Sequence, residues 1–403
     1  MLNHIFAALP AAREDAILGL NAQFQQDPRP NKVNLTVGNY VNAEGRLPLQ
    51  ATVVEAERRM LARGDLHGYL PSLGLASYAK ALERLTFGAD SPRLHLGAVA
   101  TAQAIGGTGA LFLGAAFALD ALGIQSIVIP NYSWTNHQAL FEKAGLRVST
   151  YRYFEKAQGK LLFDEMLEDL RSLPPKTMVL LQVCCHNPTG TDLTSEQWTK
   201  VIELVAERNL LPFFDLAYQG FAQGLEADAE PVRACERTGM NFLVSVSLSK
   251  SFSLYGERVG ALHVASSSAR EAGVIETILK REARTLYSNP PLHGAAVVAE
   301  ILNDPQLEAL WRSEVEDMRL RIITMRESLW KAGEALGVDL RFAREQHGIF
   351  SLTPFTAEEM KVLREEFGIY GIATGRIAMA GLTAPAIEPA ARAFAEVLAR
   401  RGR

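Results

Sequence analysis

Continuous apolar runs alternate along the chain with segments in which apolar residues recur at helical spacing. A short apolar run bounded by turn residues is typical of a strand buried on both faces, and apolar residues three or four positions apart are typical of a helix. We predict strands at 126–130, 177–185, 210–217 and 242–249, and helices at 110–123 and 195–209. This alternation predicts an α/β fold with a mostly parallel sheet between helices.

The C-terminal part of the chain follows a different pattern. A long, charged helical pattern from Asp304 to about Leu336 is predicted to lead into a C-terminal α+β piece. We predict strands in that piece at 348–353 and 376–382, and a final helix from Glu388. No linker rich in glycine, serine or proline divides the chain. We therefore expect a second domain to be built from the chain ends.

The composition removes several classes of protein. The 403 residues include 41 basic and 45 acidic ones, for a net charge of −4, and no dense basic block of the kind that binds nucleic acid. No apolar run approaches the roughly 20 residues that span a bilayer. The apolar patch at the N-terminus lacks the preceding basic residue of a secretory signal. We expect no nucleic-acid or membrane partner, and an apolar N-terminal arm.

The cysteine content also limits the possibilities. Cys184, Cys185 and Cys235 are too few for a disulfide framework, and no CxxC pair is present for zinc. Neighbouring strand residues point to opposite faces, so Cys184, Cys185 and His186 are not expected to bind one metal ion. These features predict cysteines that pack in the core, no metal, and a reducing, cytoplasmic location.

Polar residues follow four of the predicted strands. In open α/β sheets, ligands bind outside the carboxyl ends of the strands, so we expect these residues to gather in one site. In strand order they are Asn131 to Trp134, His186 to Gly190, Asp215 with Tyr218 and Gln219, and Lys250 with Arg258.

Two of these residues suggest a particular cofactor. Lys250 ends an apolar strand in a chain with only 11 lysines, and is either a solvated strand end or a desolvated amine able to form a Schiff base. Asp215 lies within the apolar run LLPFFDLAY and is either a structural hydrogen-bond acceptor or a partner for a cation. Together, an amine and a buried carboxylate suit a cofactor with an aldehyde and a protonated pyridine nitrogen, which is pyridoxal phosphate.

The phosphate of such a cofactor needs an anion site. Gly106-Gly107-Thr108-Gly109 opens the apolar helix and would offer backbone N–H groups at a helix N-terminus. A glycine-rich turn alone is weak evidence. It does not match the dinucleotide motif GxGxxG, because Phe112 falls where the third glycine belongs. Trp134 has two open interpretations, a core residue or a stacking platform for a ring.

The motifs CCHNPTG (184–190), DLAYQGF (215–221), SLSKSFSLYGERVG (247–260), YSNPP (287–291) and GRIAMAGL (375–382) resemble class I aminotransferases of the aspartate and aromatic amino acid subgroup. The resemblance covers nearly the whole chain. It implies the fold type I architecture of pyridoxal-phosphate-dependent transferases, with a mostly parallel seven-stranded sheet between helices in a large domain, a small α+β domain from both chain ends, and an obligate homodimer with shared active sites. The implied boundaries are an arm at 1–14, a small domain at 15–47 and 310–403, and a large domain at 48–309.

The resemblance also implies roles for individual residues. Lys250 would be the Schiff-base lysine, Asp215 would pair with the ring nitrogen, Tyr218 and Asn187 would bond the ring oxygen, and Trp134 would stack on the ring. The phosphate would be held by Gly106, Gly107, Thr108, Ser247 and Arg258, with Tyr69 from the neighbouring subunit. The substrate would meet Gly38, Asn39, Trp134, Asn187, Arg376 at its α-carboxylate, and Arg284 of the neighbour at a side-chain carboxylate.

The implied activity is transfer of an amino group from an L-amino acid, whether aspartate, aromatic or a related acidic one, to a 2-oxo acid such as 2-oxoglutarate, with ping-pong kinetics. Fold does not fix chemistry, so decarboxylation or elimination on the same fold, or transamination of a specialised amino acid, remains an alternative. A non-catalytic regulatory module is the least favoured alternative, since every implied catalytic residue is present.

Several positions depart from the family pattern. Tyr132 stands where proline is common, which predicts a different path for the loop carrying Trp134 because a non-proline cis bond is costly. Gln182 replaces a histidine, which predicts altered hydrogen bonding behind Asp215, whereas His137 retains the other histidine near that carboxylate.

The loop 37–41 is where relatives place substrate-pocket residues. Asn39 introduces an amide, while Val41 and Leu47 are more apolar than in aspartate-preferring relatives. We expect these differences to change the side-chain preference, because an unpaired buried polar group discriminates strongly between substrates.

Overall fold

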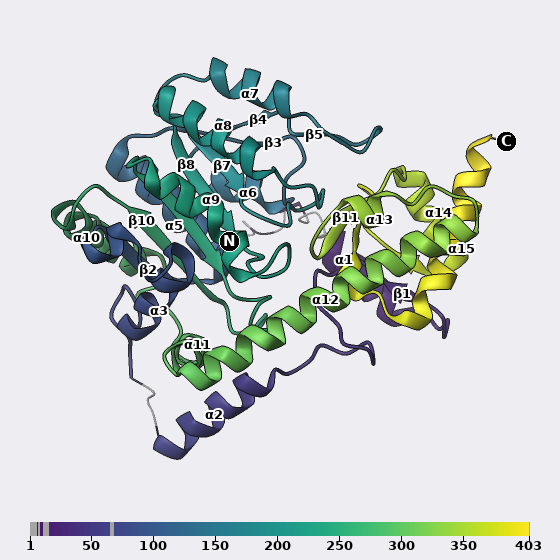
Figure 1. Cartoon of the computed structure of the whole chain (residues 1–403), viewed down its shortest axis with the longest axis horizontal. Helices are drawn as coiled ribbons and strands as arrows, with labels where there is room; N and C mark the ends of the chain where they lie inside the picture. The colour runs from purple at the N-terminus through teal and green to yellow at the C-terminus, as the bar shows by residue number, and fades with distance from the viewer. Residues whose placement is uncertain (1–5, 7–8, 11–15, 65–67, 403) are drawn as a thin grey trace, which may run out of the picture.

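The computed structural model describes residues 6, 9–10, 16–64 and 68–402. The expected arm at 1–14 therefore lies almost wholly outside the described residues. The rest forms two lobes joined by one long helix, α12 (Pro305–Ala335) (Figure 1). We call the lobe around the seven-stranded sheet the large lobe. The small lobe consists of α1 (Ala16–Gln26), β1 (Val33–Asn34), the second half of α12 and residues 342–402.

The sheet of the large lobe has the strand order β2, β10, β9, β8, β7, β3, β4. β10 is antiparallel to both its neighbours and all other pairs are parallel. The predicted mostly parallel, seven-stranded sheet is confirmed. The strands are β2 (Val99–Ile105), β3 (Ser126–Pro130), β4 (Arg147–Tyr151), β7 (Met178–Gln182), β8 (Leu211–Leu216), β9 (Phe242–Ser247) and β10 (Val259–Ala265).

Helices cover both faces of this sheet, because its central strands are apolar on both sides. One face packs against α5 (Gly106–Leu122), α6 (Asn136–Lys143) and α10 (Ala269–Leu286). The other face packs against α3 (Ala76–Phe87), α7 (Phe163–Ser172), α8 (Ser195–Glu207) and α9 (Leu225–Arg237). Further from the sheet, α11 (His293–Leu302) packs against α3 and α12, and α2 (Ala51–Arg63) packs against α11 and α12. Short elements complete the lobe: α4 (Pro92–His95) and the hairpin of β5 (Phe154–Glu155) and β6 (Lys160–Leu161).

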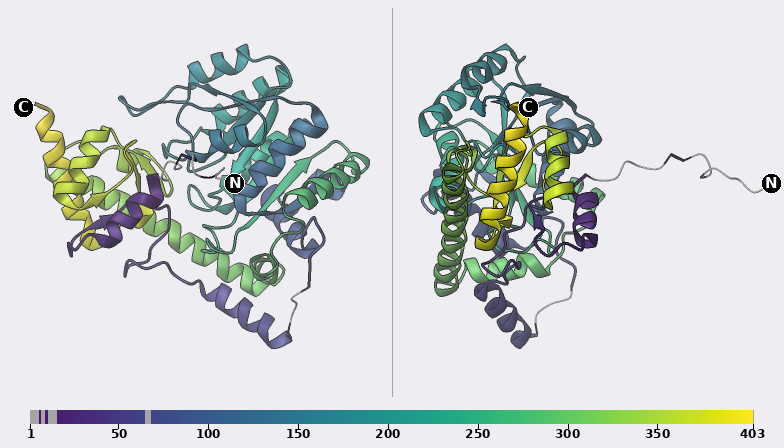
Figure 2. Two further views of the ribbon diagram at one scale, coloured as in Figure 1. Left: turned by 180° about the vertical axis from the view of Figure 1, so that it is seen from behind. Right: turned by 90° about the vertical axis from the view of Figure 1, so that its right-hand side faces the viewer.

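The small lobe brings both ends of the chain together. Both views in Figure 2 show α1 (Ala16–Gln26) beside the C-terminal elements. β1 (Val33–Asn34) pairs with β12 (Ile369–Tyr370) in parallel, and β11 (Phe350–Leu352) pairs with β13 (Arg376–Ala378) antiparallel. The remaining elements are α13 (Phe342–Glu345), α14 (Ala357–Phe367), η1 (Met379–Gly381), α15 (Ala384–Ala399) and η2 (Arg400–Gly402).

Helix α12 contributes to both hydrophobic cores. Trp311 is buried in the large lobe, where it stacks on Phe252 at 4.4 Å between ring centroids. Further along the helix, Met325 and Leu329 are buried in the core of the small lobe. The helix is therefore a structural member of each lobe as well as the connection between them.

The element boundaries differ from the predicted ones in two informative places. α5 begins at Gly106 rather than at the predicted residue 110. Its first four residues are glycines and a threonine, which the spacing of apolar residues does not mark as helical. α15 begins at Ala384 rather than Glu388, since Pro385 falls in the first turn, where no N–H donor is needed. Among the helices of the described residues, none is long and apolar enough to cross a membrane.

Candidate active site

Part of the polar set predicted at the strand ends meets in one pocket of about 270 Å³ at the carboxyl edge of the sheet, facing the small lobe: Trp134, Asn187, Asp215, Tyr218, Lys250 and Arg258. Gln219 lies elsewhere and donates to the carbonyls of Leu85 and Leu225. Side chains from both lobes line the pocket. The lining consists of Val37, Gly38, Asn39, Gly107, Thr108, Leu111, Trp134, Gln182, Asn187, Asp215, Ala217, Tyr218, Ser247, Ser249, Lys250, Tyr255, Arg258, Phe350 and Arg376.

Lys250 follows β9, and its amine lies deep in this pocket. Its Nζ is 5.0 Å from the centre of the Tyr218 ring. Burial lowers the pKa of Lys250 to about 8, aided by the nearby Arg258 and Arg376 and opposed by Asp215. Because only the uncharged amine has a free electron pair, this lowered pKa makes Lys250 a better nucleophile and base near neutral pH.

Asp215 is the second titratable group of the pocket. It sits near the end of β8 and is almost fully buried. Its Oδ2 lies 3.2 Å from Nε2 of His137, whose Nδ1 is 2.8 Å from the Ser133 hydroxyl. An ionised carboxylate only accepts, so Nε2 carries the proton and Nδ1 accepts from Ser133. The buried His137 thus keeps an N–H directed at the Asp215 carboxylate.

Gln182, which replaces a histidine, bonds the loop after β7. Its amide pairs with the backbone of Asn187: Oε1 accepts the Asn187 N–H at 2.9 Å, and Nε2 donates to the Asn187 carbonyl at 3.0 Å. Nε2 also lies 3.2 Å from Nε2 of His186. Gln182 therefore fixes the loop that carries Asn187.

Asn187 connects the two lobes across the pocket. Its Nδ2 donates to the Tyr218 hydroxyl at 3.1 Å, and its Oδ1 accepts from the guanidinium of Arg376 at 3.4 Å. Arg376 also donates to the carbonyl of Thr36 at 2.8 Å and lies over the Phe350 ring at 4.4 Å. The guanidinium is thus held at the wall of the pocket by contacts from three segments.

The start of α5 forms an anion site together with the residues after β9. Gly106 has a φ of +63°, and a Cβ there would lie 2.4 Å from the Arg258 guanidinium. A Cβ at Gly107 would lie 2.8 Å from Cβ of Ser247. Both glycines are therefore required for close approach of these side chains to the helix N-terminus, whose first-turn N–H groups have no helical partner.

Within this anion site, Gly106 itself is oriented away from a ligand. Its N–H donates to the carbonyl of Arg258 at 2.8 Å, and it does not line the pocket. Arg258 adopts a left-handed φ of +54°, unusual for a non-glycine residue, and donates to Ser249 and to the Tyr255 carbonyl. The residues of this group that line the pocket are Gly107, Thr108, Ser247, Ser249 and Arg258.

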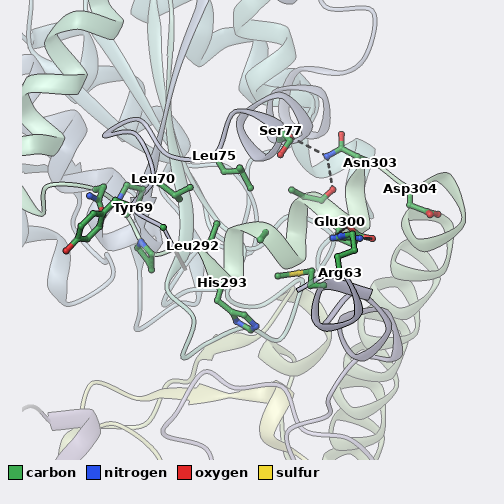
Figure 3. Close-up of a pocket in the computed structure, with 17 residues that line it drawn as sticks. Arg63, Tyr69, Leu70, Leu75, Ser77, Leu292, His293, Glu300, Asn303 and Asp304 are labelled. Atoms are coloured by element: carbon green, nitrogen blue, oxygen red, sulfur yellow. Dashed lines mark hydrogen bonds and ion pairs between the residues drawn. The ribbon is translucent and has the colours of Figure 1, made fainter. Parts of the chain in front are cut away.

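Besides Gly106, two more predicted residues, Tyr69 and Arg284, lie outside the pocket. Tyr69 is 95% exposed and lines a second, larger cavity of about 810 Å³, at the opposite end from Arg63 and Glu300 (Figure 3). Arg284 is exposed in the last turn of α10, where it donates to Ser288. In a single chain, neither is part of the pocket.

The loop with Tyr132, which departs from the family pattern, still brings Trp134 to the pocket. The peptide bond before Tyr132 is trans. The side-chain oxygen of Asn131 holds this loop by accepting the N–H groups of Tyr132, Tyr153 and Phe154. In the loop 37–47, Asn39 lines the pocket, whereas Val41 and Leu47 do not.

Some lining residues were not anticipated from the sequence. Ser249 lies two positions after Ser247, and its hydroxyl contacts both Ser247 and Arg258. Strand periodicity was a usable signal for it. Phe350 carried no such signal, because it comes from the small lobe and reaches the pocket only through tertiary packing.

Comparison with known proteins identifies the family. Residues 30–394 match the model of the family described as aminotransferase class I and II. The chain belongs to this family. The class I and II aminotransferases are enzymes that use pyridoxal phosphate to move an amino group from an amino acid to a 2-oxo acid, so the predicted enzyme class, reaction and cofactor are confirmed.

Individual relatives of this aminotransferase match along almost the full length. The aspartate aminotransferase of Pseudomonas aeruginosa is 46% identical, over 98% of this chain and 100% of its own. The aromatic-amino-acid aminotransferase of Escherichia coli is 45% identical with the same coverage. The crystal structure of the aromatic-amino-acid aminotransferase of Burkholderia pseudomallei, covalently bound to pyridoxal phosphate, superposes with a TM-score of 0.95 at 46% identity, covering 98% and 99% of the two chains. The predicted resemblance and fold type are confirmed.

The residues of the pocket fit pyridoxal phosphate. An amine with a lowered pKa, a buried carboxylate and a helix N-terminus that Gly106 and Gly107 let Arg258 and Ser247 approach lie around one cavity. These match the aldehyde, the protonated ring nitrogen and the phosphate of the cofactor, respectively.

Proposed function

We propose that this aminotransferase acts on L-amino acids with acidic or aromatic side chains and uses 2-oxoglutarate as amino acceptor in a ping-pong reaction. The observation that carries the proposal is the pocket in which Lys250, Asp215 and Arg376 meet. Relatives of near-equal identity are named for aspartate and for aromatic amino acids, which supports a substrate range including both.

Each polar group of the pocket has a proposed role toward the cofactor. Lys250 would bond its aldehyde carbon and Asp215 would hold the proton on its ring nitrogen, with the hydrogen bond from His137 orienting the carboxylate. Trp134 would stack on the ring, and Asn187 and Tyr218 would bond the ring oxygen. The phosphate would be held by Gly107, Thr108, Ser247 and Arg258, while Gly106 supplies the left-handed turn that admits them.

The chemistry divides between the cofactor and the protein. When bound, the cofactor supplies a ring that accepts the electron pair left when the substrate loses its Cα proton. Lys250 Nζ would accept that proton and, as an ammonium, donate it to the cofactor carbon that carried the aldehyde, because a pKa of about 8 permits both states near neutral pH. Arg376 would bind the substrate α-carboxylate with its planar guanidinium, which suits a carboxylate's two oxygens.

Product analysis tests this function. The purified enzyme with aspartate or phenylalanine and 2-oxoglutarate is expected to form one glutamate for each 2-oxo acid released from the donor, with parallel lines in double-reciprocal plots. Release of carbon dioxide, or of ammonia without glutamate, would instead indicate decarboxylation or elimination.

The side-chain preference is expected to depend on Asn39. We predict that Asn39→Val shifts kcat/KM toward aromatic donors by about 10-fold relative to aspartate, because an apolar wall no longer offers an amide to a polar side chain. The measurement compares kcat/KM for aspartate, glutamate, phenylalanine and tyrosine in both proteins. The exposed Leu47→Val, outside the pocket, is the control. Unchanged ratios in Asn39→Val would contradict the assignment.

We further propose a homodimer in which each active site borrows Tyr69 and Arg284 from the neighbouring chain. Both side chains are exposed and lie away from the pocket of their own chain, which is consistent with a function in a second copy. The apolar residues of the 810 Å³ cavity, including Leu70, Leu75 and Leu292, are proposed to be covered by that copy.

Subunit mixing tests the shared site. Lys250→Ala and Arg284→Ala are each expected to lose most activity with aspartate as a homodimer. A mixed dimer is expected to regain one competent site, because one chain contributes Lys250 and the other Arg284. Mixing Lys250→Ala with Asp215→Asn is the comparison: both residues line the same chain's pocket, so each pocket of the mixed dimer carries one of the two changes and no activity above the parents is expected. Failure of the first mixture to regain activity above its parents would contradict the proposal that Arg284 comes from the neighbouring chain.

The domain boundaries and the cytoplasmic location remain predictions.

A further inference from the structure

A hairpin of the large lobe reaches across to the small lobe. The strands β5 and β6 extend from the sheet toward the region of β11 and α13 (Figure 1). Lys156 lies directly after β5 in the turn of this hairpin and is partly buried, whereas Lys160 on β6 is exposed.

The ammonium group of Lys156 bonds two carbonyl groups of the small lobe. Its Nζ donates to the carbonyl of Phe355 and to that of Thr374, both at 2.6 Å. Hydrogen bonds from an ionised donor are shorter and stronger than neutral ones. Nearby, Glu359 and Arg401 form an ion pair at 2.6 Å, so the local charges besides Lys156 nearly cancel. Lys156 thus joins two segments of the small lobe to the large lobe.

The segment bonded by Lys156 leads directly into Arg376. Gly375 has a left-handed φ of +93°, and a Cβ there would lie 2.7 Å from Nζ of Lys156. The carbonyl of Gly375 accepts both the backbone N–H and the hydroxyl of Thr353, at 3.0 Å and 2.8 Å. The next residue is Arg376, the first residue of β13. A side chain of the large lobe therefore fixes the turn from which the guanidinium enters the pocket.

We propose that Lys156 is a positioning residue for substrate binding: its two hydrogen bonds hold the turn 372–375 against the large lobe, so that Arg376 is already placed to receive a substrate carboxylate. The inference rests on the carboxylate-binding role of Arg376 proposed above. Lys156 touches neither the pocket nor Arg376, so its effect is transmitted through the backbone of Thr374 and Gly375.

The test replaces the ammonium group and keeps the aliphatic stem. Lys156→Met in the pyridoxal-phosphate-loaded enzyme is expected to raise KM for both amino acid and 2-oxo acid about 10-fold, the low end of the effect of losing one charge-assisted hydrogen bond, with kcat changed less than twofold. Lys156→Arg, which also donates to carbonyl groups, is expected to restore KM to within about threefold. Lys160→Met is the matched control on the same hairpin and is expected to leave KM unchanged.

A second readout does not depend on turnover. In Lys156→Met, amide hydrogen exchange of a peptide covering 372–376 is expected to accelerate, while exchange in β8 and the affinity for pyridoxal phosphate stay at the wild-type values. If Lys156→Met does not fold, Lys156→Gln, with a shorter donor, is measured in its place and the same changes are expected in smaller degree.

Two outcomes separate this inference from the function on which it rests. If Arg376→Ala raises KM but Lys156→Met behaves like Lys160→Met in both KM and exchange, the positioning role is overturned. If Arg376→Ala leaves KM unchanged, the carboxylate-binding role fails. A rise in KM in Lys156→Met without faster exchange at 372–376, or without restoration by Lys156→Arg, also overturns the proposal.

Discussion

Replacing Lys250 with alanine is expected to lower kcat/KM by about 10⁴-fold, the upper end of the range for a group that transfers protons in the transition state. The reason is that one amine serves two purposes, bonding the cofactor and moving the Cα proton. The measurement combines steady-state kinetics with borohydride reduction of the loaded protein followed by peptide mapping. Wild-type protein is expected to carry the reduced cofactor on the peptide with Lys250, and the variant is expected to carry none.

The pH dependence of cofactor capture provides the control for this interpretation. The pKa of Lys250 is lowered from 10.5 to about 8, so the amine is mostly charged below pH 8 and mostly free above it. The rate at which the cofactor-free protein takes up pyridoxal phosphate is therefore expected to rise with pH and level off above about pH 8. A rate that keeps rising toward pH 10 would show that the amine is not desolvated, and labelling of a different lysine would refute the assignment of Lys250.

Asp215→Asn is expected to lower kcat by about 10²- to 10³-fold, the range measured when one preorganised electrostatic partner is removed from an active site. Asparagine has the same shape but no charge, so the ring nitrogen of the cofactor loses the group that holds its proton. We expect the absorbance of the bound cofactor to shift together with the loss of kcat. Spectra across a pH series and single-turnover kinetics with aspartate measure the two effects.

A second buried aspartate supplies the control for Asp215→Asn. Asp228 lies outside the pocket and accepts the N–H groups of Gly220, Ala222 and Gln223. Burial raises the pKa of Asp228, and its role is structural. Asp228→Asn is expected to lower the melting temperature and leave the cofactor spectrum unchanged. Equal spectral changes in both variants would mean that Asp215 acts through packing rather than charge.

The part of the site that can be predicted depends on short stretches of sequence, namely each apolar run and the polar residues directly after it. Buried parallel strands are recognisable as apolar runs, and their carboxyl ends share one edge of a sheet, so the sequence alone predicts that Asp215, Asn187 and Lys250 lie close together. The roles of these residues came from the family resemblance, because the same residue types at strand ends are compatible with other chemistry.

The unpredictable part depends on contacts between distant segments. The sequence did not indicate what Gln182 bonds instead of Asp215. An amide can pair with the N–H and the carbonyl of one residue at once, and Asn187 offers that pair. Likewise, nothing around Lys156 in the sequence indicates that its amine reaches Phe355 and Thr374, about 200 positions away. Hydropathy patterns specify which face is buried and leave the partner of a polar side chain undetermined.

Helix α12 gives the two lobes a common evolutionary constraint. Because Trp311 completes one core and Leu329 the other, neither lobe has a full core without its own part of the same uninterrupted helix. A recombination point within α12 would join two half-helices selected against different neighbours. Exchange of the small lobe between related enzymes therefore requires a helix α12 whose two halves fit both cores, so the two lobes have to be exchanged together with that helix.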